Sequence, residues 1–360
     1  MRFLALTIYV LCSQLYMVQI CYGFGFLAPV GVALSSIVLG TICRFRECCS
    51  EYAIHADFDA LEDSLNKHIY GQHLVKDIVI NALKSHWDST HPPQKALTLS
   101  FHGWPGSGKN YVTRFIVENL YKLGSKSSFV HHFIGRIHFP LEDHVAKYQN
   151  DLQEWIKGNV TKCPRQLFIF DEVDKMPPKV LNILKPIIDY RDNVDGIDFR
   201  DSVFIFLSNT GAELINEHFL DFWNNKGMKR EELKLSDFEK LITKGAFNEE
   251  GGFHHSDTIK SNLIDHYVPF LPMERRHIKM CIIDEFKQRN VTSPKEEHIS
   301  EAMEFIEWGP SKERVFSTTG FFSDWKHQRH CPEPGVTYSV VQLQHSSDAL
   351  IEKVRRLPNV

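Results

Sequence analysis

Short apolar runs alternate with amphipathic segments across the middle of this 360-residue chain. The runs "ALTLSFHGW" (96–104), "QLFIFDE" (166–172) and "SVFIFLSNTG" (202–211) are bounded by charged or turn-forming residues, a pattern typical of buried strands. Between them, apolar residues recur at three- and four-residue spacing, which predicts helices over 110–124, 146–159 and 179–191. Apolar strands that alternate with helices predict an α/β fold, in which helices cover both faces of a parallel sheet.

The regions on either side of these strands have a helical pattern. Residues 51–87 carry apolar side chains at helical spacing, and "HPPQK" (91–95) ends the pattern. From Leu271 onward the helical pattern returns, over 272–290 and 296–309. We therefore predict an α/β domain over 50–270, a smaller helical domain over 271–335 and a divergent tail over 336–360.

The N-terminus differs from the rest of the chain. Arg2 precedes a long apolar run, and residues 1–23 fit a secretory signal peptide with small residues near its end. A second apolar stretch lies within residues 24–49, where glycines and Pro29 interrupt it. It is interpretable as a transmembrane helix, as an anchor lying on or partly in the bilayer, or as a buried core helix. Because Gly and Pro disfavour a straight span, we favour the membrane anchor.

Composition narrows the classes of partner and compartment. The formal net charge is −4 and no long basic run is present, so we expect no nucleic-acid partner. The chain has 8 Cys but no C-x-x-C pair, which disfavours zinc, whereas an exported chain favours disulfides. Two N-x-T sequons, at Asn159 and Asn290, are compatible with lumenal glycosylation.

A glycine-rich loop joins the first predicted strand to the helix after it. Its residues are Gly103, Trp104, Pro105, Gly106, Ser107, Gly108, Lys109 and Asn110. In this pattern the backbone N–H groups and the helix N-terminus bind phosphate, and the lysine contacts the β- and γ-phosphates. The loop therefore predicts ATP binding by residues 50–270. Asn110 stands where a Ser or Thr normally binds Mg²⁺.

Polar side chains end the two following strands. Asp171 comes at the end of "LFIFD", where an acid holds Mg²⁺ directly or through water, and Glu172 comes next as a candidate general base for the attacking water. Asn209 ends the third strand. If that strand lies between the other two, Asn209 can hydrogen-bond the γ-phosphate or the attacking water. ATP and Mg²⁺ are thus the predicted cofactors.

These motifs resemble those of the torsins, a lumenal branch of the AAA+ ATPases close to the Clp and heat-shock-100 proteins. The resemblance covers about residues 40 to 316 and rests on "CRFRECC", "GWPGSGKN", "FIFDEVDKM", "FIFLSN", "LDFWNNKGMKREELKL" and "YVPFLP". It implies an adenine site near Tyr70, Gln72 and His73, in a segment similar to one in Clp proteins. It also implies an ATPase of the endoplasmic reticulum lumen and nuclear envelope, associated with the membrane surface.

Two departures from related sequences imply slow hydrolysis without a partner. Asn110 offers Mg²⁺ a bulkier ligand than Ser. Where Clp-type ATPases carry an arginine that reaches a neighbouring subunit, residues 262–265 read Asn-Leu-Ile-Asp. The torsin resemblance implies that the lumenal domain of a lamina-associated-polypeptide-type membrane activator donates the arginine, within a homo-oligomer or mixed ring that remodels protein clients. Arg275 and Arg276 are weaker candidates, since their helix pattern fits solvent-exposed positions.

A third departure concerns the C-terminal end. The Gly-Cys-Lys motif that torsins carry after "ERVFS" is missing. Cys331 is a conceivable stand-in for its cysteine, so a redox pair with Cys281 stays open. A nucleotide-dependent scaffold with little or no hydrolysis is therefore the alternative function. A small-molecule kinase is disfavoured by the Asp171–Glu172 pair, Asn209 and the helical C-terminal region.

Overall fold

The computed structural model describes residue 43 and residues 47–318, apart from residues 89, 227–228, 257–258, 260–261, 289–290 and 311–313. The predicted signal peptide, most of the predicted membrane segment, the predicted tail, Asn290 and Cys331 lie outside the described residues. The chain divides into one unit that ends at Ser50 and a second, compact unit that begins at Glu51. Among the described residues, no helix combines the length and apolar character needed to cross a bilayer.

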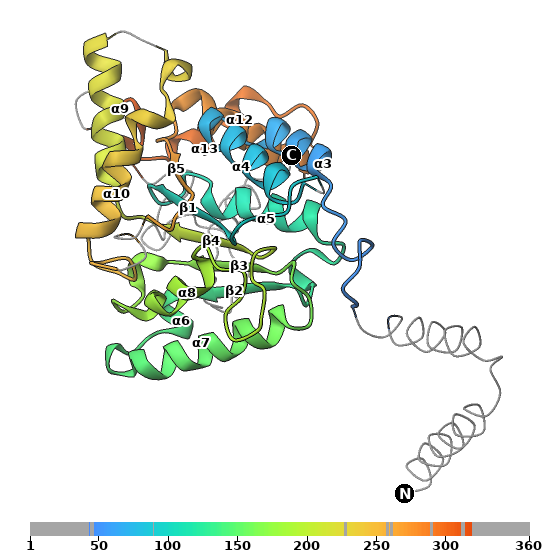
Figure 1. Cartoon of the computed structure of the whole chain (residues 1–360). Helices are drawn as coiled ribbons and strands as arrows, with labels where there is room; N and C mark the ends of the chain where they lie inside the picture. Colours follow the sequence, from blue (N-terminus) through green and yellow to red (C-terminus); the bar gives the residue numbers. More distant parts are fainter. Residues whose placement is uncertain are drawn as a thin grey trace, which may run out of the picture. The chain divides into compact units, whose positions relative to one another are not determined.

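Five parallel strands form the central sheet, in the order β2-β3-β4-β1-β5 (Figure 1). They are β1 (Leu97–Gly103), β2 (Val130–Ile134), β3 (Leu167–Asp171), β4 (Val203–Ser208) and β5 (His266–Phe270). The three strands predicted from apolar runs are β1, β3 and β4. Because β4 pairs with both β1 and β3, the strand that ends before Asn209 lies between the other two, as the site prediction requires.

Helices cover both faces of this sheet, which confirms the predicted α/β fold (Figure 1). The longer helices are α3 (Phe58–His68), α4 (His73–His86), α5 (Lys109–Leu120), α7 (Val145–Val160), α9 (Ala212–Lys226), α10 (Glu239–Asn248), α12 (Arg275–Gln288) and α13 (Glu296–Glu304). The short helices α6 (Gly135–His138) and α8 (Lys185–Ile188) complete the set labelled in Figure 1.

Strand alternation divides the core into two layers. On one face Leu99, Ile169 and Ile205 pack in a cluster with α3, α4 and α5. On the opposite face Phe168 and Phe204 stack with ring centroids 5.0 Å apart, in a cluster shared with α7 and α8. Because successive strand residues point to opposite faces, continuous apolar runs supply both layers. This burial fixes the sheet that carries the candidate site.

Two strands were not predicted, and each has a local reason. The β2 sequence "VHHFI" carries two histidines, which obscure the apolar run. The β5 sequence "HYVPF" contains Pro269, and a proline lacks the N–H that a central strand donates. β5 lies at the edge of the sheet, where a proline is tolerated.

Two helix predictions need correction. The helical pattern over 51–87 forms two helices, α3 and α4, because the chain turns at residues 69–72, where Gly71 has a positive φ. The predicted helix over 179–191 forms only a 3-10 segment, Val180–Leu184, followed by the four-residue α8. Pro186 lies within the first turn of α8, so its missing N–H removes a hydrogen bond from a continuous helix through both segments.

The C-terminal region is helical, as predicted. α12 and α13 pack together around an apolar cluster that includes Ile282, Phe286 and Ile299. A small antiparallel pair, β6 (Trp308–Gly309) and β7 (Phe316–Ser317), follows these helices. The proposed boundary of a separate helical domain at residue 271 stays a prediction.

Cysteine chemistry agrees with the expectation of disulfides. Cys43 is bonded to Cys48, and Cys49 and Cys163 are also disulfide-bonded. Cys281 is a free thiol on α12, and burial raises its pKa to about 12. A thiol with so high a pKa is protonated and unreactive at neutral pH. The suggested pairing with Cys331 lies outside the described residues.

Candidate functional site

Three loops meet at the carboxyl edge of the sheet. The glycine-rich loop leaves β1, Asp171 and Glu172 end β3, and Asn209 follows β4. Because β1, β4 and β3 are neighbouring parallel strands, their carboxyl ends lie at the same edge. In open α/β sheets this edge is where ligands bind.

The backbone of the glycine-rich loop needs glycine at specific positions. Gly108 caps α5 with φ of 106°, in the left-handed region that other residues rarely adopt. At Gly103 a Cβ atom would lie 2.5 Å from the Phe270 carbonyl oxygen of β5. The loop therefore sits directly against the sheet, and the N-terminus of α5 is directed toward the space that it encloses.

Lys109 lies at the centre of the loop. Its Nζ donates hydrogen bonds to the carbonyl oxygens of Gly103 (2.6 Å) and Trp104 (3.2 Å) and to Asn209 Oδ1 (2.9 Å). Burial lowers the pKa of Lys109 to about 8, although nearby Asp171 and other acids act in the opposite direction. A bound polyphosphate would favour the charged ammonium form, so this lysine suits an anionic ligand.

Asn110 and Asp171 are paired beside the loop. Asn110 Nδ2 donates to Asp171 Oδ2 at 3.1 Å, and the Glu172 N–H donates to Asp171 Oδ1 at 2.8 Å. Burial alone would raise the pKa of Asp171, but interactions with His132, Glu172 and Asn110 outweigh it and lower the pKa. The carboxylate is thus ionised at neutral pH.

The oxygens of this pair fit a magnesium ion. Mg²⁺ prefers carboxylate, carbonyl and water oxygens and is often held by one or two protein ligands plus substrate phosphates. Among the residues that the structure describes, no cluster of three or more His, Cys, Asp or Glu could hold a metal without such help. Asn110 presents its NH₂ group to Asp171, so its amide must turn before Oδ1 can bind a cation.

Glu172 lies at the rim of the site in a strained backbone conformation. Its φ is 52°, which is uncommon for a residue other than glycine and occurs most often at functional sites. Its Oε2 is 3.6 Å from Arg136 Nε, and its side chain is partly exposed. The Glu172 carbonyl lies so close to Gly135 that a Cβ there would be 2.4 Å from the oxygen. The position suits a carboxylate that receives a proton from water.

Asp174 is a site residue that the sequence reasoning missed. It accepts hydrogen bonds from the Asn209 backbone N–H (3.1 Å) and from Asn209 Nδ2 (3.4 Å). These contacts leave Asn209 Oδ1 facing Lys109. The signal was present as the final acid of "DEVD", and only the sheet order shows that this acid faces β4.

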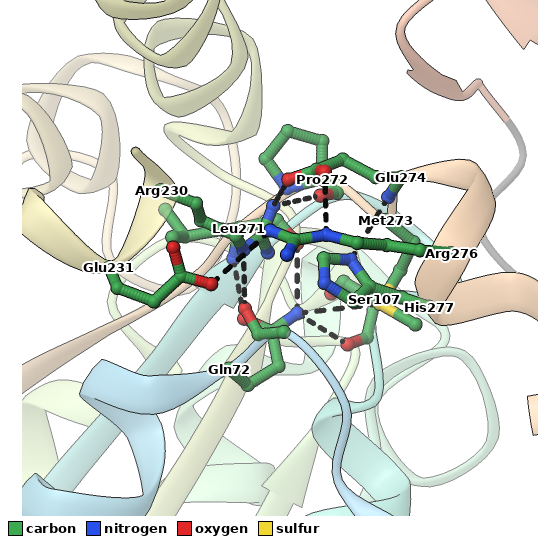
Figure 2. A network of polar contacts seen from close by, with 11 residues as sticks. Gln72, Ser107, Arg230, Glu231, Leu271, Pro272, Met273, Glu274, Arg276 and His277 are labelled. Carbon is green, nitrogen blue, oxygen red and sulfur yellow. Dashed lines mark hydrogen bonds and ion pairs between the residues drawn. The ribbon is translucent and has the colours of Figure 1, made fainter. Parts of the chain in front are cut away.

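The predicted adenine-site residues differ in their surroundings. The Gln72 side chain is buried, and its Nε2 donates to the Ser107 carbonyl of the glycine-rich loop at 3.1 Å (Figure 2). The Tyr70 hydroxyl donates to Asp284 of α12, and His73 Nε2 donates to the Leu233 carbonyl at 3.1 Å. The structure therefore brings Gln72 to the loop, whereas the polar atoms of Tyr70 and His73 contact other segments.

The positions considered for an arginine finger are occupied by structural contacts. Leu263 is buried in the apolar core, and its carbonyl accepts from Thr98 Oγ1 at 2.8 Å. Arg275 stacks over the Trp308 ring at 4.2 Å. Arg276 is exposed and pairs with acidic side chains on either side of it. None of these residues points to the chemistry of the glycine-rich loop.

Two further predicted features are local. Asn159 lies in the last turn of α7, where its Nδ2 donates to the Trp155 carbonyl at 2.8 Å. The sugar-accepting nitrogen therefore has an intrahelical partner. Trp104 of the glycine-rich loop donates through Nε1 to the Thr318 carbonyl, at the end of the described chain. The sequence beyond Thr318 is where the torsin motif is missing.

Comparisons with known proteins agree with this architecture. A sequence model of the torsin family matches residues 43–170, and a model of the AAA domain (Cdc48 subfamily) matches residues 141–249. A torsin-like protein of Caenorhabditis elegans is 38% identical over 284 residues, which are 77% of this chain and 78% of the relative. A torsin-like protein of Drosophila melanogaster is 43% identical over 256 residues, 69% of this chain and 75% of the relative.

Solved structures show a similar fold at low identity. The S. cerevisiae Hsp104–ADP complex matches with a TM-score of 0.52 and 18% identity, over 78% of this chain and 46% of that chain. A closed-state Hsp104 with ATPγS and FITC casein matches with a TM-score of 0.51 and 18% identity, over 74% and 45%. The chain thus spans less than half of the Hsp104 chain, and the likeness concerns the fold.

Proposed function

Because this chain belongs to the torsin family of AAA+ ATPases, we propose that it binds ATP with Mg²⁺ and hydrolyses it slowly until a partner completes the pocket. The observation that carries the proposal is the convergence of Lys109, Asp171, Glu172 and Asn209 at one edge of the sheet. Lys109 and Asp171 come from different strands and meet only because β4 lies between β1 and β3.

Each side chain has a role that follows from its contacts. Lys109 and the backbone N–H groups of residues 106–109 bind the phosphates, and Asp171 with Asn110 holds Mg²⁺, which neutralises phosphate charge when bound. Glu172 orients the attacking water and accepts its proton. Asn209, held by Asp174, keeps Lys109 directed toward the phosphates or positions the water.

Slow turnover follows from what the pocket lacks. An arginine finger contributes roughly 10³–10⁵ in rate by neutralising charge in the transition state. The stretch 262–265 supplies a buried Leu263 instead, and Arg275 and Arg276 are engaged elsewhere. The arginine therefore comes from another polypeptide, for which we propose the lumenal domain of a lamina-associated-polypeptide-type membrane activator.

The proposed setting is the lumen of the endoplasmic reticulum and nuclear envelope. Support comes from the apolar N-terminal sequence and from the Cys43–Cys48 disulfide, since disulfides persist in oxidising compartments. There the protein would form a homo-oligomer or mixed ring and remodel protein clients or membrane assemblies. A pull-down with the Glu172→Gln variant in ATP would capture activator and client together.

Phosphate release tests the proposal directly. The purified chain with ATP and Mg²⁺ should release phosphate near the background rate, and the activator's lumenal domain should raise the rate by about 10³-fold. Glu172→Gln should abolish the stimulated rate, while the exposed control Glu142→Gln should retain it. Rapid hydrolysis by the purified chain alone would contradict the proposal.

One observation favours a second function, a nucleotide-dependent scaffold. The Gly-Cys-Lys motif is missing from the end of the chain, so a γ-phosphate contact from the C-terminal region is missing with it. A scaffold would bind ATP and its partner yet release no phosphate with or without the activator domain. The same assay therefore separates the two functions.

A further inference from the structure

Arg230 is a buried cation between α9 and α10. Its side chain is 4% exposed, and it lies over the Phe219 ring at 5.2 Å. Nε donates to the Gly71 carbonyl at 2.6 Å, and Nη1 donates to the Pro272 carbonyl at 2.7 Å (Figure 2). Nη1 also lies 3.3 Å from Glu274 Oε1. One side chain thus joins the turn before α4 to the segment between β5 and α12.

Gln72 joins the same two segments one residue away. Its Nε2 donates to the Leu271 carbonyl at 2.8 Å, and its Oε1 accepts from the Leu271 N–H at 2.9 Å. The same Nε2 donates to the Ser107 carbonyl of the glycine-rich loop (Figure 2). The two bridges therefore lie in series between Arg230 and the loop that the proposed function assigns to phosphate.

The turn that both bridges hold has little freedom to change. Gly71 has φ of 70°, and a Cβ there would lie 2.6 Å from the His277 ring of α12. The backbone is thus confined by a ring on one side and by the Arg230 guanidinium on its carbonyl. Any loss of the guanidinium moves the constraint on Gln72, which follows directly in the chain.

We infer that Arg230 is a positioning residue for the phosphate-binding loop: it fixes the turn at Gly71, and Gln72 passes that constraint to the Ser107 carbonyl. The inference rests on the proposed function, because it assigns nucleotide affinity to a side chain outside the loop. Ser107 lies between the two glycines whose N–H groups would face the phosphates, so a shift of its carbonyl changes their direction. Arg230 itself touches no phosphate.

The chemistry of the position calls for arginine. Two carbonyls are held by different nitrogens of one planar guanidinium, a geometry that the single ammonium of lysine does not reproduce. Burial lowers the pKa of Arg230 to about 10, so the group stays charged at neutral pH. Removing it leaves two buried carbonyls and Glu274 without their donor, a costly state for buried polar groups.

The test is a double-mutant cycle read as ADP affinity by calorimetric titration. The variants are Arg230→Met, Gln72→Met and the pair together, with Arg230→Lys as a milder change. Lys279→Met is the matched control, since Lys279 makes an exposed ion pair with Glu296 on the same helix α12. Lys109→Ala reports the signal without loop binding. Melting temperatures are recorded for every variant.

Each single variant should weaken ADP binding by about tenfold, the effect of losing one or two hydrogen bonds to a charged or buried group. The double variant should also lose about tenfold rather than hundredfold, because the two bridges act in series. Lys279→Met should bind within about twofold of the unchanged chain, as expected for an exposed pair. If Arg230→Met does not fold, Arg230→Lys with Gln72→Met supplies the same cycle.

The possible failures are distinguishable. Unchanged ADP affinity in folded Arg230→Lys and Arg230→Met, or losses that multiply in the double variant, would overturn the role of Arg230 alone. A lowered melting temperature with unchanged affinity would show a merely structural contact and would overturn it as well. If the unchanged chain binds ADP no better than Lys109→Ala, the proposed function fails and the inference fails with it.

Discussion

Asn110 Nδ2 donates a 3.1 Å hydrogen bond to Asp171 Oδ2, across 61 residues of sequence. The residue that replaces the usual magnesium-binding hydroxyl thus contacts the acid expected to share the ion. A serine or threonine hydroxyl is short enough to bind both a cation and a neighbouring acid, whereas Asn110 must rotate its amide to present oxygen. The pairing gives a physical reason for imperfect metal placement and slow hydrolysis.

Replacing Asn110 with Thr should therefore change hydrolysis more than affinity. With the activator present, phosphate release should rise several-fold, while the ATP dissociation constant should change by less than about threefold, since the loop N–H groups and Lys109 dominate binding. Asn119→Thr on the same helix α5 is the control, because its amide bonds only within α5 and to Ser64. Equal changes in rate and affinity would contradict this explanation.

Asp174 should be as necessary as the residues that the sequence identifies. In Asp174→Asn one acceptor oxygen becomes a donor, so one of its two contacts to Asn209 is lost. We expect a loss of about 1–3 kcal/mol in the free energy of unfolding and at least tenfold in stimulated phosphate release. Chemical denaturation and the phosphate assay measure both. Exposed Asp192→Asn serves as control, and full activity in Asp174→Asn would refute the assignment.

Leu263→Arg should not create an arginine finger within the chain. The side chain at this position points into the apolar core, so an arginine there would be buried without a partner. We expect a loss of about 3 kcal/mol or more in stability and no gain in phosphate release without activator. Asn262→Arg, at the exposed neighbouring position, is the matched control and should fold normally. A folded, faster Leu263→Arg enzyme would show that residue 263 reaches a phosphate.

Stability should fall as the pH is lowered from about 6.5 toward 4. His102 is buried in β1, with Nδ1 2.9 Å from the Thr210 carbonyl and Nε2 2.7 Å from Ser100 Oγ. Burial lowers its pKa to about 4. The unfolded chain then binds a proton that the folded chain does not, so stability is full above the unfolded pKa of about 6.5 and is lost as the pH falls.

His102→Gln should flatten this dependence. The variant will be less stable at pH 7 but should lose less stability between pH 6.5 and 4.5 than the unchanged chain, by about 1–3 kcal/mol. Denaturant titrations at several pH values measure the slope. His91→Gln, on an exposed loop, should leave the slope unchanged. A slope unaffected by His102→Gln would assign the acid sensitivity to the other buried histidines, such as His86 and His277, whose pKa values burial also lowers.

The sequence alone determined the features that depend on local period and local chemistry. The glycine-rich loop, the acids after "LFIF" and Asn209 after "VFIFLS" are each encoded within a few residues, and the structure has strands at all three places. The helical character of α5, α7, α12 and α13 also followed from apolar spacing, because a helix needs only its own residues to form hydrogen bonds.

Only the tertiary structure decided which of these local features meet. β2 and β5 carry weak patterns because sheet pairing and burial, rather than intrinsic preference, make them strands. The contacts of Asp174 with Asn209 and of Gln72 with Ser107 join residues 35 positions apart, and Gln72 with Leu271 joins residues 199 apart. A sequence pattern reports the face on which a side chain lies but not its partner. The partner depends on strand order and on which buried polar atoms need a hydrogen bond.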